Sequence, residues 1–288
     1  MGPPVAQSCK KLLPFDPAQK PMVRLTKAGA ARLLGMDQKQ FNNFYQYAGE
    51  FGEGELNSER ILEWKRDYES RCFALSTEEY AKCLDFALAI HFRGYASIDW
   101  GTARQREFGQ KVSNWVRGQL GELGFAHFCR ERLGFDVELD FEMHQDIVPQ
   151  DVLAIVENGQ RRIPQHKIAV KATKPRNASL VLSTNEVELP DRQSDVYVFT
   201  RVDLPDDHLL RISQQEILSL LRNQQHFSLY ADRIQPLDSI KCEIAGFAYR
   251  ADLELSDSIP GYQFGSERYV KQTGNLRRNL SEWREAIR

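Results

Sequence analysis

The hydrophobic pattern of this 288-residue chain changes character part-way along its length. Up to about residue 133, apolar side chains recur at helical spacing, whereas later residues form short β-rich runs separated by turns. This order predicts an α/β (α+β) fold, in which an all-helical N-terminal domain precedes a core with a central mixed sheet flanked by helices. Strands are expected at 152–156, 167–172, 179–182, 196–202 and 240–253, and a helix at 213–222.

Proline, glycine and charged residues divide the chain into four expected segments. Prolines at positions 3, 4, 14 and 17 indicate an irregular leader over 1–20. A helical domain is predicted for 21–95 and the core for 96–260. The last segment, 261–288, is polar and basic and is predicted to be a helical extension.

Composition excludes several classes of protein. With 42% hydrophobic and 27% charged residues the chain is expected to fold, and no apolar run approaches the roughly 20 residues that cross a bilayer. The five cysteines are irregularly spaced, which predicts reduced thiols and a cytoplasmic location. Because the net charge is only −2, it does not by itself indicate nucleic-acid binding, and a basic surface would be confined to one cleft.

Two of the predicted strands carry charged residues at notable positions. Asp151 precedes the strand 152–156, and Lys171 lies within the strand 167–173. Alternation places Lys171 and Ala169 on the same face of that strand. Burying a lysine ammonium is costly unless the charge is paired, so a lysine in this strand needs a chemical reason.

Phosphodiester hydrolysis supplies such a reason. The reaction needs a cation that neutralises charge on the phosphate, an activated water, and a positive group near the transition state. Mg²⁺ prefers oxygen ligands and is usually held by one or two carboxylates. An aspartate on one strand, and an acid two residues before a lysine on its neighbour, would build that site. Asp151 and Lys171 are present, and Ala169 stands at the position of the second acid.

The helix expected over 104–133 contains three glycines close together, Gly118, Gly121 and Gly124. Glycine costs about 1 kcal/mol in a helix interior, so this spacing predicts close packing of the helix against a sheet. Glu122 lies among these glycines and is either a surface residue or a neighbour of the site.

Three segments in this order resemble the PD-(D/E)XK nuclease superfamily, which includes most type II restriction endonucleases. Residues 149–151 (Pro-Gln-Asp) resemble the first half-motif, loosened by one residue. Residues 168–173 (Ile-Ala-Val-Lys-Ala-Thr) resemble the second half-motif, with Ala169 in place of the acid. Residues 118–122 resemble the helix that often brings a further glutamate to the active site. The resemblance covers about residues 104–205.

This resemblance implies a set of catalytic and metal-binding residues. Asp151 and the backbone carbonyl of Val170 would bind Mg²⁺, for which Mn²⁺ can substitute, and Glu122 would reach the ion through water. Lys171 would stabilise charge in the transition state. Since Ala169 replaces an acid, the resemblance implies an impaired enzyme, and no small-molecule cofactor is expected.

Three explanations for Ala169 remain open at this point. The sequence is a catalytic-site variant made to trap bound DNA, or the acid has moved to Glu186 or Glu188, or the domain is a natural pseudo-nuclease.

The N-terminal segment 25–41 is similar to a helix-turn-helix, with Ala30 and Ala31 allowing close helix contact and Gly35 making the turn. Amide and lysine side chains on its second helix could contact bases in the major groove. The alternative is a small helical bundle that contacts protein. The residues predicted to bind DNA here, together with two basic residues after the second half-motif, are Gln38, Lys39, Gln40, Asn42, Asn43, Lys174 and Arg176.

The function predicted from these features is that of a sequence-specific, Mg²⁺-dependent DNA endonuclease. Its partner would be double-stranded DNA, without any membrane association. A homodimer is expected because DNA sites are often two-fold symmetric and each active site handles one scissile phosphate. The alternatives are a non-catalytic DNA-binding protein on a nuclease-like core, or a nuclease subunit of a larger defence or transposition assembly.

Overall fold

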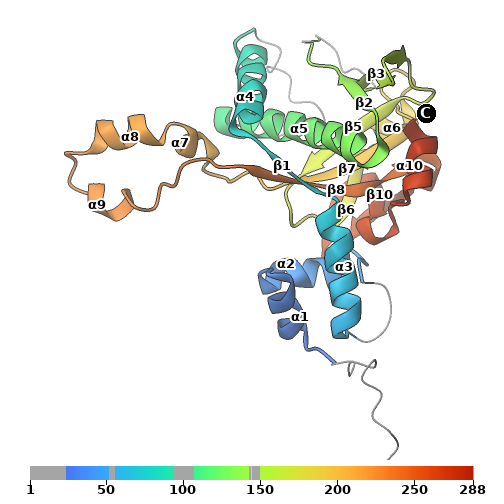
Figure 1. Ribbon diagram of the computed structural model, residues 1–288, viewed down its shortest axis with the longest axis horizontal. Helices are drawn as coiled ribbons and strands as arrows, with labels where there is room; N and C mark the ends of the chain where they lie inside the picture. Colours follow the sequence, from blue (N-terminus) through green and yellow to red (C-terminus); the bar gives the residue numbers. More distant parts are fainter. Residues whose placement is uncertain (1–23, 52–55, 94–106, 143, 145–149, 288) are drawn as a thin grey trace, which may run out of the picture.

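The structure is a computed structural model that describes residues 24–51, 56–93, 107–142, 144 and 150–287. Its strands form three sheets, and the helices lie on and around them (Figure 1). Parallel and antiparallel strand pairs occur together with helices, which confirms the predicted α/β class. None of the helices in the described ranges is both long and apolar enough to span a bilayer. The leader predicted for 1–20 lies outside the described residues.

The central sheet has the strand order β1 (Cys72–Leu75), β8 (Ile240–Tyr249), β7 (Val196–Val202) and β5 (Ile168–Thr173). Strands β5 and β7 are parallel, and the other two pairs are antiparallel. Strand β7 is buried along its whole length. Among the described residues β5 is an edge strand of this sheet, so one row of its backbone groups is open to other partners.

Helix α5 (Phe108–Phe128) packs across one face of the central sheet (Figure 1). A Cβ on Gly121 would lie 2.6 Å from the Cβ of a β5 residue, and one on Gly124 would lie 2.3 Å from the Sγ of a β8 residue. The predicted close packing is therefore confirmed at these two glycines, where any larger residue would push the helix off the sheet. It is not needed at Gly118, whose added Cβ would meet nothing within 4 Å.

A second sheet covers the other face of the central sheet. It consists of β6 (Ser179–Ser183), β10 (Tyr262–Gln272) and β9 (Glu254–Ile259), and the short helix α6 (Thr184–Glu188) follows β6 directly. Apolar side chains from both sheets and α6 form one buried cluster between the layers. Its members include Ala169, Leu180, Leu182, Val187, Tyr197, Phe199 and Ala245.

The third sheet is a small antiparallel one made of β2 (Asp136–Leu139), β3 (Val152–Glu157) and β4 (Gln160–Arg162). Asn158 and Gly159 connect β3 to β4 with φ values of 52° and 76°. Positive φ at both positions is the conformation of a tight hairpin turn, which Asn-Gly favours. The turn returns the chain beside β3 as β4. The other end of β3 begins next to the open edge of β5, because the amide of Asp151 donates to the carbonyl of Ile168.

The N-terminal helices have an apolar core of their own, which includes Phe41, Phe44 and Trp64. Thr26 and Asp37 accept hydrogen bonds as N-caps of the first two helices, and Gly35 (φ 68°) separates them. The order of these elements is that expected for a helix-turn-helix-like segment. They are α1 (Lys27–Leu34), α2 (Gln38–Asn42), η1 (Asn43–Tyr47) and α3 (Ser58–Ser70).

The prediction that 21–95 is all-helical is wrong at β1, which pairs with β8 in the central sheet. Helix α4 (Thr77–Phe92) also belongs to the main core, because its Tyr80, Cys83 and Ala87 are buried in the same cluster as α5. The four-residue run of β1 is too short to show a period, so its pairing was invisible in the sequence.

The prediction of a helical extension over 261–288 is wrong for most of that segment. Strand β10 occupies its first part and pairs with both β6 and β9. Over 261–287, the part of the segment that the structure describes, only α10 (Leu280–Ile287) is α-helical, and its Trp283 is buried in the main core. Polar residues on an exposed sheet resemble those on an exposed helix, which explains the error. One 3₁₀ turn, η5 (Thr273–Asn275), lies in this region, and another, η4 (Arg250–Asp252), precedes it between β8 and β9.

A hydrogen-bonded chain through His208 joins three helices of the main core. Helix α7 (His208–Ile212) opens a projecting excursion that also contains α8 (Gln214–Leu221) and α9 (Phe227–Tyr230) (Figure 1). The Tyr80 hydroxyl of α4 lies 2.6 Å from Nδ1 of His208, and the Ser113 hydroxyl of α5 lies 2.8 Å from Nε2. Burial lowers the pKa of His208 to about 4, so the imidazole is neutral at pH 7.

We expect the melting temperature to fall by a few degrees as pH is lowered from about 6.5 towards 4. In that range the unfolded chain takes up a proton at position 208 and the folded chain does not, since the folded pKa is the lower one. Calorimetry of the parent and of His208→Gln tests this, with the exposed His226→Gln as the matched control. A pH dependence that is the same in all three proteins would contradict it.

Candidate active site

Two backbone contacts fasten the start of β3 to the open edge of β5. The Asp151 amide donates to the carbonyl of Ile168 at 2.8 Å, and the Val170 amide donates to Oδ2 of Asp151 at 2.6 Å. The N–H and C=O of one strand residue point to the same side of the strand. The Val170 carbonyl is therefore directed to the edge where Asp151 lies, so the two predicted metal ligands share one edge.

Lys171 follows on β5 and pairs with an acid from another element. Its Nζ lies 3.1 Å from Oε1 of Glu186, with side chains 33% and 32% exposed. Burial lowers the pKa of Lys171, but Glu186 and Asp151 outweigh that effect and leave it above its ordinary value. The Lys171 ammonium is therefore charged at neutral pH and held in one place.

Glu186 is itself held by the beginning of α6. Its Oε2 accepts hydrogen bonds from the Ser183 amide at 3.0 Å and the Ser183 hydroxyl at 2.9 Å. The Glu186 amide in turn donates to the Ser183 hydroxyl oxygen at 3.3 Å, which completes a capping box with the first of these bonds. Burial raises the pKa of Glu186, but Lys171 and these hydrogen bonds outweigh it, and the pKa lies below its ordinary value. The Glu186 carboxylate is therefore ionised, with one oxygen on Lys171.

Glu122 lies in the buried side of α5 and has an unsatisfied oxygen. Gln119 donates to its Oε1 at 3.1 Å, while Oε2 is buried without a hydrogen-bond partner among the described residues. Burial, and then the nearby Asp151 carboxylate, raise the pKa of Glu122 well above its ordinary value, although Lys171 opposes the shift. Burial also raises the pKa of Asp151. Two crowded carboxyl groups with an orphaned oxygen are the arrangement that a cation would stabilise.

Asp140 is a neighbour that the sequence did not reveal. Its amide donates to the Asp151 carbonyl at 3.0 Å, and its charge contributes to the raised pKa of both Glu122 and Asp151. Within the described residues, no three histidine, cysteine or acidic side chains converge closely enough to hold a metal ion. The oxygen donors fit a hard cation that keeps several waters, with the Val170 carbonyl completing the set.

Ala169 is 4% exposed and lies in the cluster between the two sheets, on the same strand face as Lys171. Glu186 contacts Lys171 from that side, whereas Glu188 accepts a hydrogen bond from the Tyr269 hydroxyl at 3.1 Å. Of the two acids considered as replacements, the structure therefore brings Glu186 to the lysine.

The residues predicted to contact DNA fall into two groups. Gln38 and Lys39 are exposed, and Gln40 is half-buried. The prediction that the second helix exposes Gln40, Asn42 and Asn43 to DNA is wrong, because all three are half-buried. Oδ1 of Asn42 is buried, and the Asn43 amide donates to the Arg176 carbonyl at 3.1 Å.

The reason for this error is a contact between the N-terminal helices and the core. Arg176 approaches Asp37 at 3.4 Å, in addition to accepting the hydrogen bond from Asn43. Both contacts join residues more than 130 positions apart, which no local pattern could reveal. They place the turn 174–178 beside α2, so the exposed Lys39 and the basic turn lie on neighbouring parts of the surface.

The chain was also compared with known proteins. No protein-family model, no curated protein and no solved structure matches it.

Proposed function

We propose that this chain is a Mg²⁺-dependent DNA endonuclease in which Glu186 takes the place of the acid absent at position 169. The observation that carries the proposal is the 3.1 Å contact between Lys171 and Glu186, beside an edge where Asp151 binds the Val170 amide. A fixed ammonium, an ionised carboxylate and a buried carboxyl pair are the groups that phosphodiester hydrolysis uses.

Each residue has a role in this proposal. Asp151 and the Val170 carbonyl would hold Mg²⁺ or Mn²⁺, with Glu122 contributing through water. The bound ion would neutralise charge on the phosphate and lower the pKa of its water. Lys171 would donate to a phosphate oxygen and stabilise the charge that develops on it. Glu186 would orient that ammonium and supply the second carboxylate of the site.

DNA recognition is proposed for the surface formed by α2 and the turn 174–178. Gln38 and Lys39 are exposed and could reach base edges, while Lys174 and Arg176 are exposed and could contact phosphates. Sequence specificity and a homodimer remain part of the proposal, since cleavage of both strands at a symmetric site is simplest with two copies.

A non-catalytic DNA-binding protein is the second candidate, because Ala169 lacks the usual acid. The experiment that separates the two incubates the full chain with supercoiled plasmid in Mg²⁺, in Mn²⁺ and in EDTA. We expect nicked and linear products with either metal, and none in EDTA, where duplex binding should persist and weaken steeply with salt. Asp151→Asn, purified in the same way, controls for contaminating nuclease. Binding without cleavage under every condition would refute the enzyme and favour the second candidate.

A further inference from the structure

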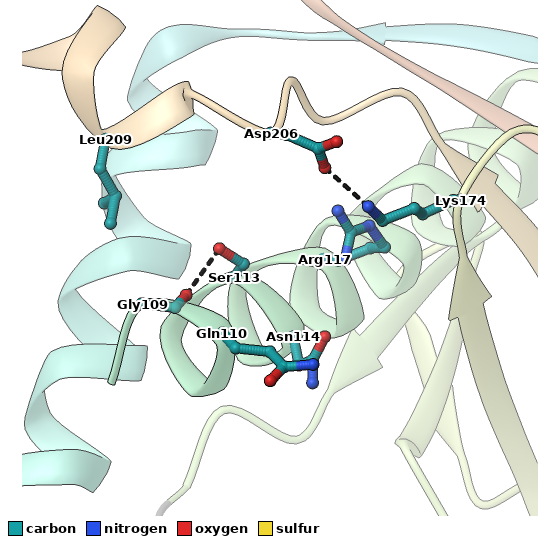
Figure 2. A pocket seen from close by; sticks show the side chains of 8 residues that line it. All are labelled: Gly109, Gln110, Ser113, Asn114, Arg117, Lys174, Asp206 and Leu209. Atoms are coloured by element: carbon teal, nitrogen blue, oxygen red, sulfur yellow. Dashed lines mark hydrogen bonds and ion pairs between the residues drawn. The ribbon is translucent and has the colours of Figure 1, made fainter. Parts of the chain in front are cut away.

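A cavity of about 300 Å³ lies beside the N-terminal half of α5, where the segments after β5 and β7 meet it (Figure 2). It shares no residue with the candidate active site. Its volume is at the lower end of the range for small-molecule sites, about 300–1,000 Å³. The residues that line it are Gly109, Gln110, Ser113, Asn114, Arg117, Lys174, Asp206 and Leu209.

Arg117 is the unusual member of this lining. Arg117 is 6% exposed, and its Nε is buried without a hydrogen-bond partner among the described residues. Figure 2 draws no hydrogen bond or ion pair to its guanidinium, which lies at the same end of the pocket as Lys174. Burial lowers the pKa of Arg117, and the nearby Asp206 carboxylate opposes that shift only in part. A buried charge is costly unless it is paired, so this arginine is maintained at a cost to stability.

The other charges at this end of the pocket are exposed and form an ion pair with each other. Lys174 Nζ lies 2.7 Å from Oδ1 of Asp206, and the two side chains are 57% and 83% exposed. Exposed ion pairs of this kind are worth little, so Asp206 can turn into solvent when another anion arrives. The amides of Gln110 and Asn114 add further hydrogen-bonding groups to the rim.

We infer that this pocket binds a phosphate group. The arginine guanidinium offers a planar fork that matches phosphate oxygens, and phosphate would supply the hydrogen-bond acceptor that the buried Nε of Arg117 lacks. Lys174 would contribute a second positive charge after releasing Asp206. The phosphate can belong to a phosphodiester of DNA, since Lys174 follows Lys171 by three residues, or to a free nucleotide. The inference goes beyond the proposed cleavage and stands on Arg117, which has no part in it.

The first measurement uses thermal unfolding of the full chain in EDTA with inorganic phosphate or deoxyadenosine monophosphate. The second uses fluorescence anisotropy with a labelled duplex across a salt series. Arg117→Met removes the charge and keeps the length of the side chain. Asp206→Asn removes the competing anion. Arg130→Met is the matched control, because Arg130 lies just beyond the other end of α5 and is 63% exposed.

We expect Arg117→Met without ligand to melt at the same temperature as the parent or higher, since a buried charge with an unsatisfied Nε is gone. This variant should lose its response to the ligand. Either phosphate no longer raises its melting temperature, or its affinity for duplex DNA falls at least about tenfold and the slope of log affinity against log salt concentration decreases by about one. Asp206→Asn should strengthen the same response, and Arg130→Met should leave it unchanged.

The two sources of phosphate give different patterns. If Arg117→Met loses only the stabilisation by phosphate or nucleotide, the natural ligand of the pocket is a free phosphate monoester. If it loses affinity for the duplex, the ligand is a phosphate of the DNA backbone. Either result supports the inference. The inference is overturned if the parent protein responds to none of phosphate, nucleotide and duplex. It is also overturned if Arg117→Met binds all of them as the parent does. An Arg117→Met protein that melts lower or fails to fold would make the arginine structural and also overturn it. Absence of cleavage by the parent would leave these results standing.

Discussion

Glu186→Gln is expected to lower Mg²⁺-dependent DNA cleavage by about a hundredfold or more, the size typical of losing one charged group that acts at or beside a reacting phosphate. The variant removes the negative charge that lies 3.1 Å from Lys171. Glutamine also occurs at this position of a capping box, so the start of α6 should stay folded. Initial rates on plasmid DNA, together with circular dichroism of both proteins, measure the effect.

Two further proteins make this result specific. Glu188→Gln removes a carboxylate from the same helix that bonds to Tyr269 rather than to Lys171, and it should cut at the parent rate. Adding Ala169→Glu to Glu186→Gln places an acid on the same strand face as Lys171 and should restore part of the lost activity. If Glu186→Gln cuts as fast as the parent, Glu186 is not the replacement acid.

Arg201→Met is expected to reduce the free energy of unfolding by about 3–5 kcal/mol, because it breaks a buried ionic network. Arg201 is 2% exposed on β7. Its Nη1 donates to both oxygens of Glu243 at 3.0 Å, and its Nη2 donates to Glu50 at 3.2 Å and to Thr273 at 2.7 Å. The substitution leaves Glu50 and Glu243 buried with fewer donors, which is the costly step.

The network joins three parts of the chain that lie far apart in sequence. Glu50 lies between η1 and α3, Arg71 precedes β1, and Arg278 lies before α10. Arg71 Nη1 donates to Glu243 at 2.6 Å, and Arg278 Nη2 donates to Glu50 at 2.7 Å. Arg201→Met should therefore loosen the attachment of the N-terminal helices to the sheet as well as lower stability.

Urea unfolding at pH 7 measures this loss, and Arg161→Met is the control. Arg161 pairs with Glu138 at 2.9 Å, but the side chains are 56% and 43% exposed, so its loss should cost less than about 1 kcal/mol. Burial raises the pKa of Glu50, but the three arginines outweigh it and lower the pKa to about 2. Its contribution is then complete above about pH 4.5 and is lost as pH falls through 2. Equal losses in the two variants would contradict a special role for the network.

The sequence alone was sufficient for the parts of this protein that depend on local pattern. Buried strands such as β7 and the Asn158–Gly159 turn follow from apolar runs and from residues that tolerate positive φ. The order of Asp151 and Lys171 in two neighbouring strand segments also indicated that they share a site. The short turn, however, joins β3 to β4, and Asp151 meets β5 only through a hydrogen bond to Ile168 across two separate sheets. The closely spaced glycines of α5 also predicted its contact with a sheet, because glycine in a helix interior allows close packing.

Tertiary structure alone decided which distant groups meet. Glu186 reaches Lys171 only because α6 packs on the side of the central sheet to which Ala169 points, and that placement depends on the pairing of β6 with β10, nearly 90 residues later in the chain. The pocket around the buried Arg117 and the network around Arg201 depend in the same way on segments brought together from across the chain. The sequence does not distinguish a charged residue that is solvated from one that is paired or one that is buried without a partner. Its free energy is set by neighbours that only the folded chain supplies.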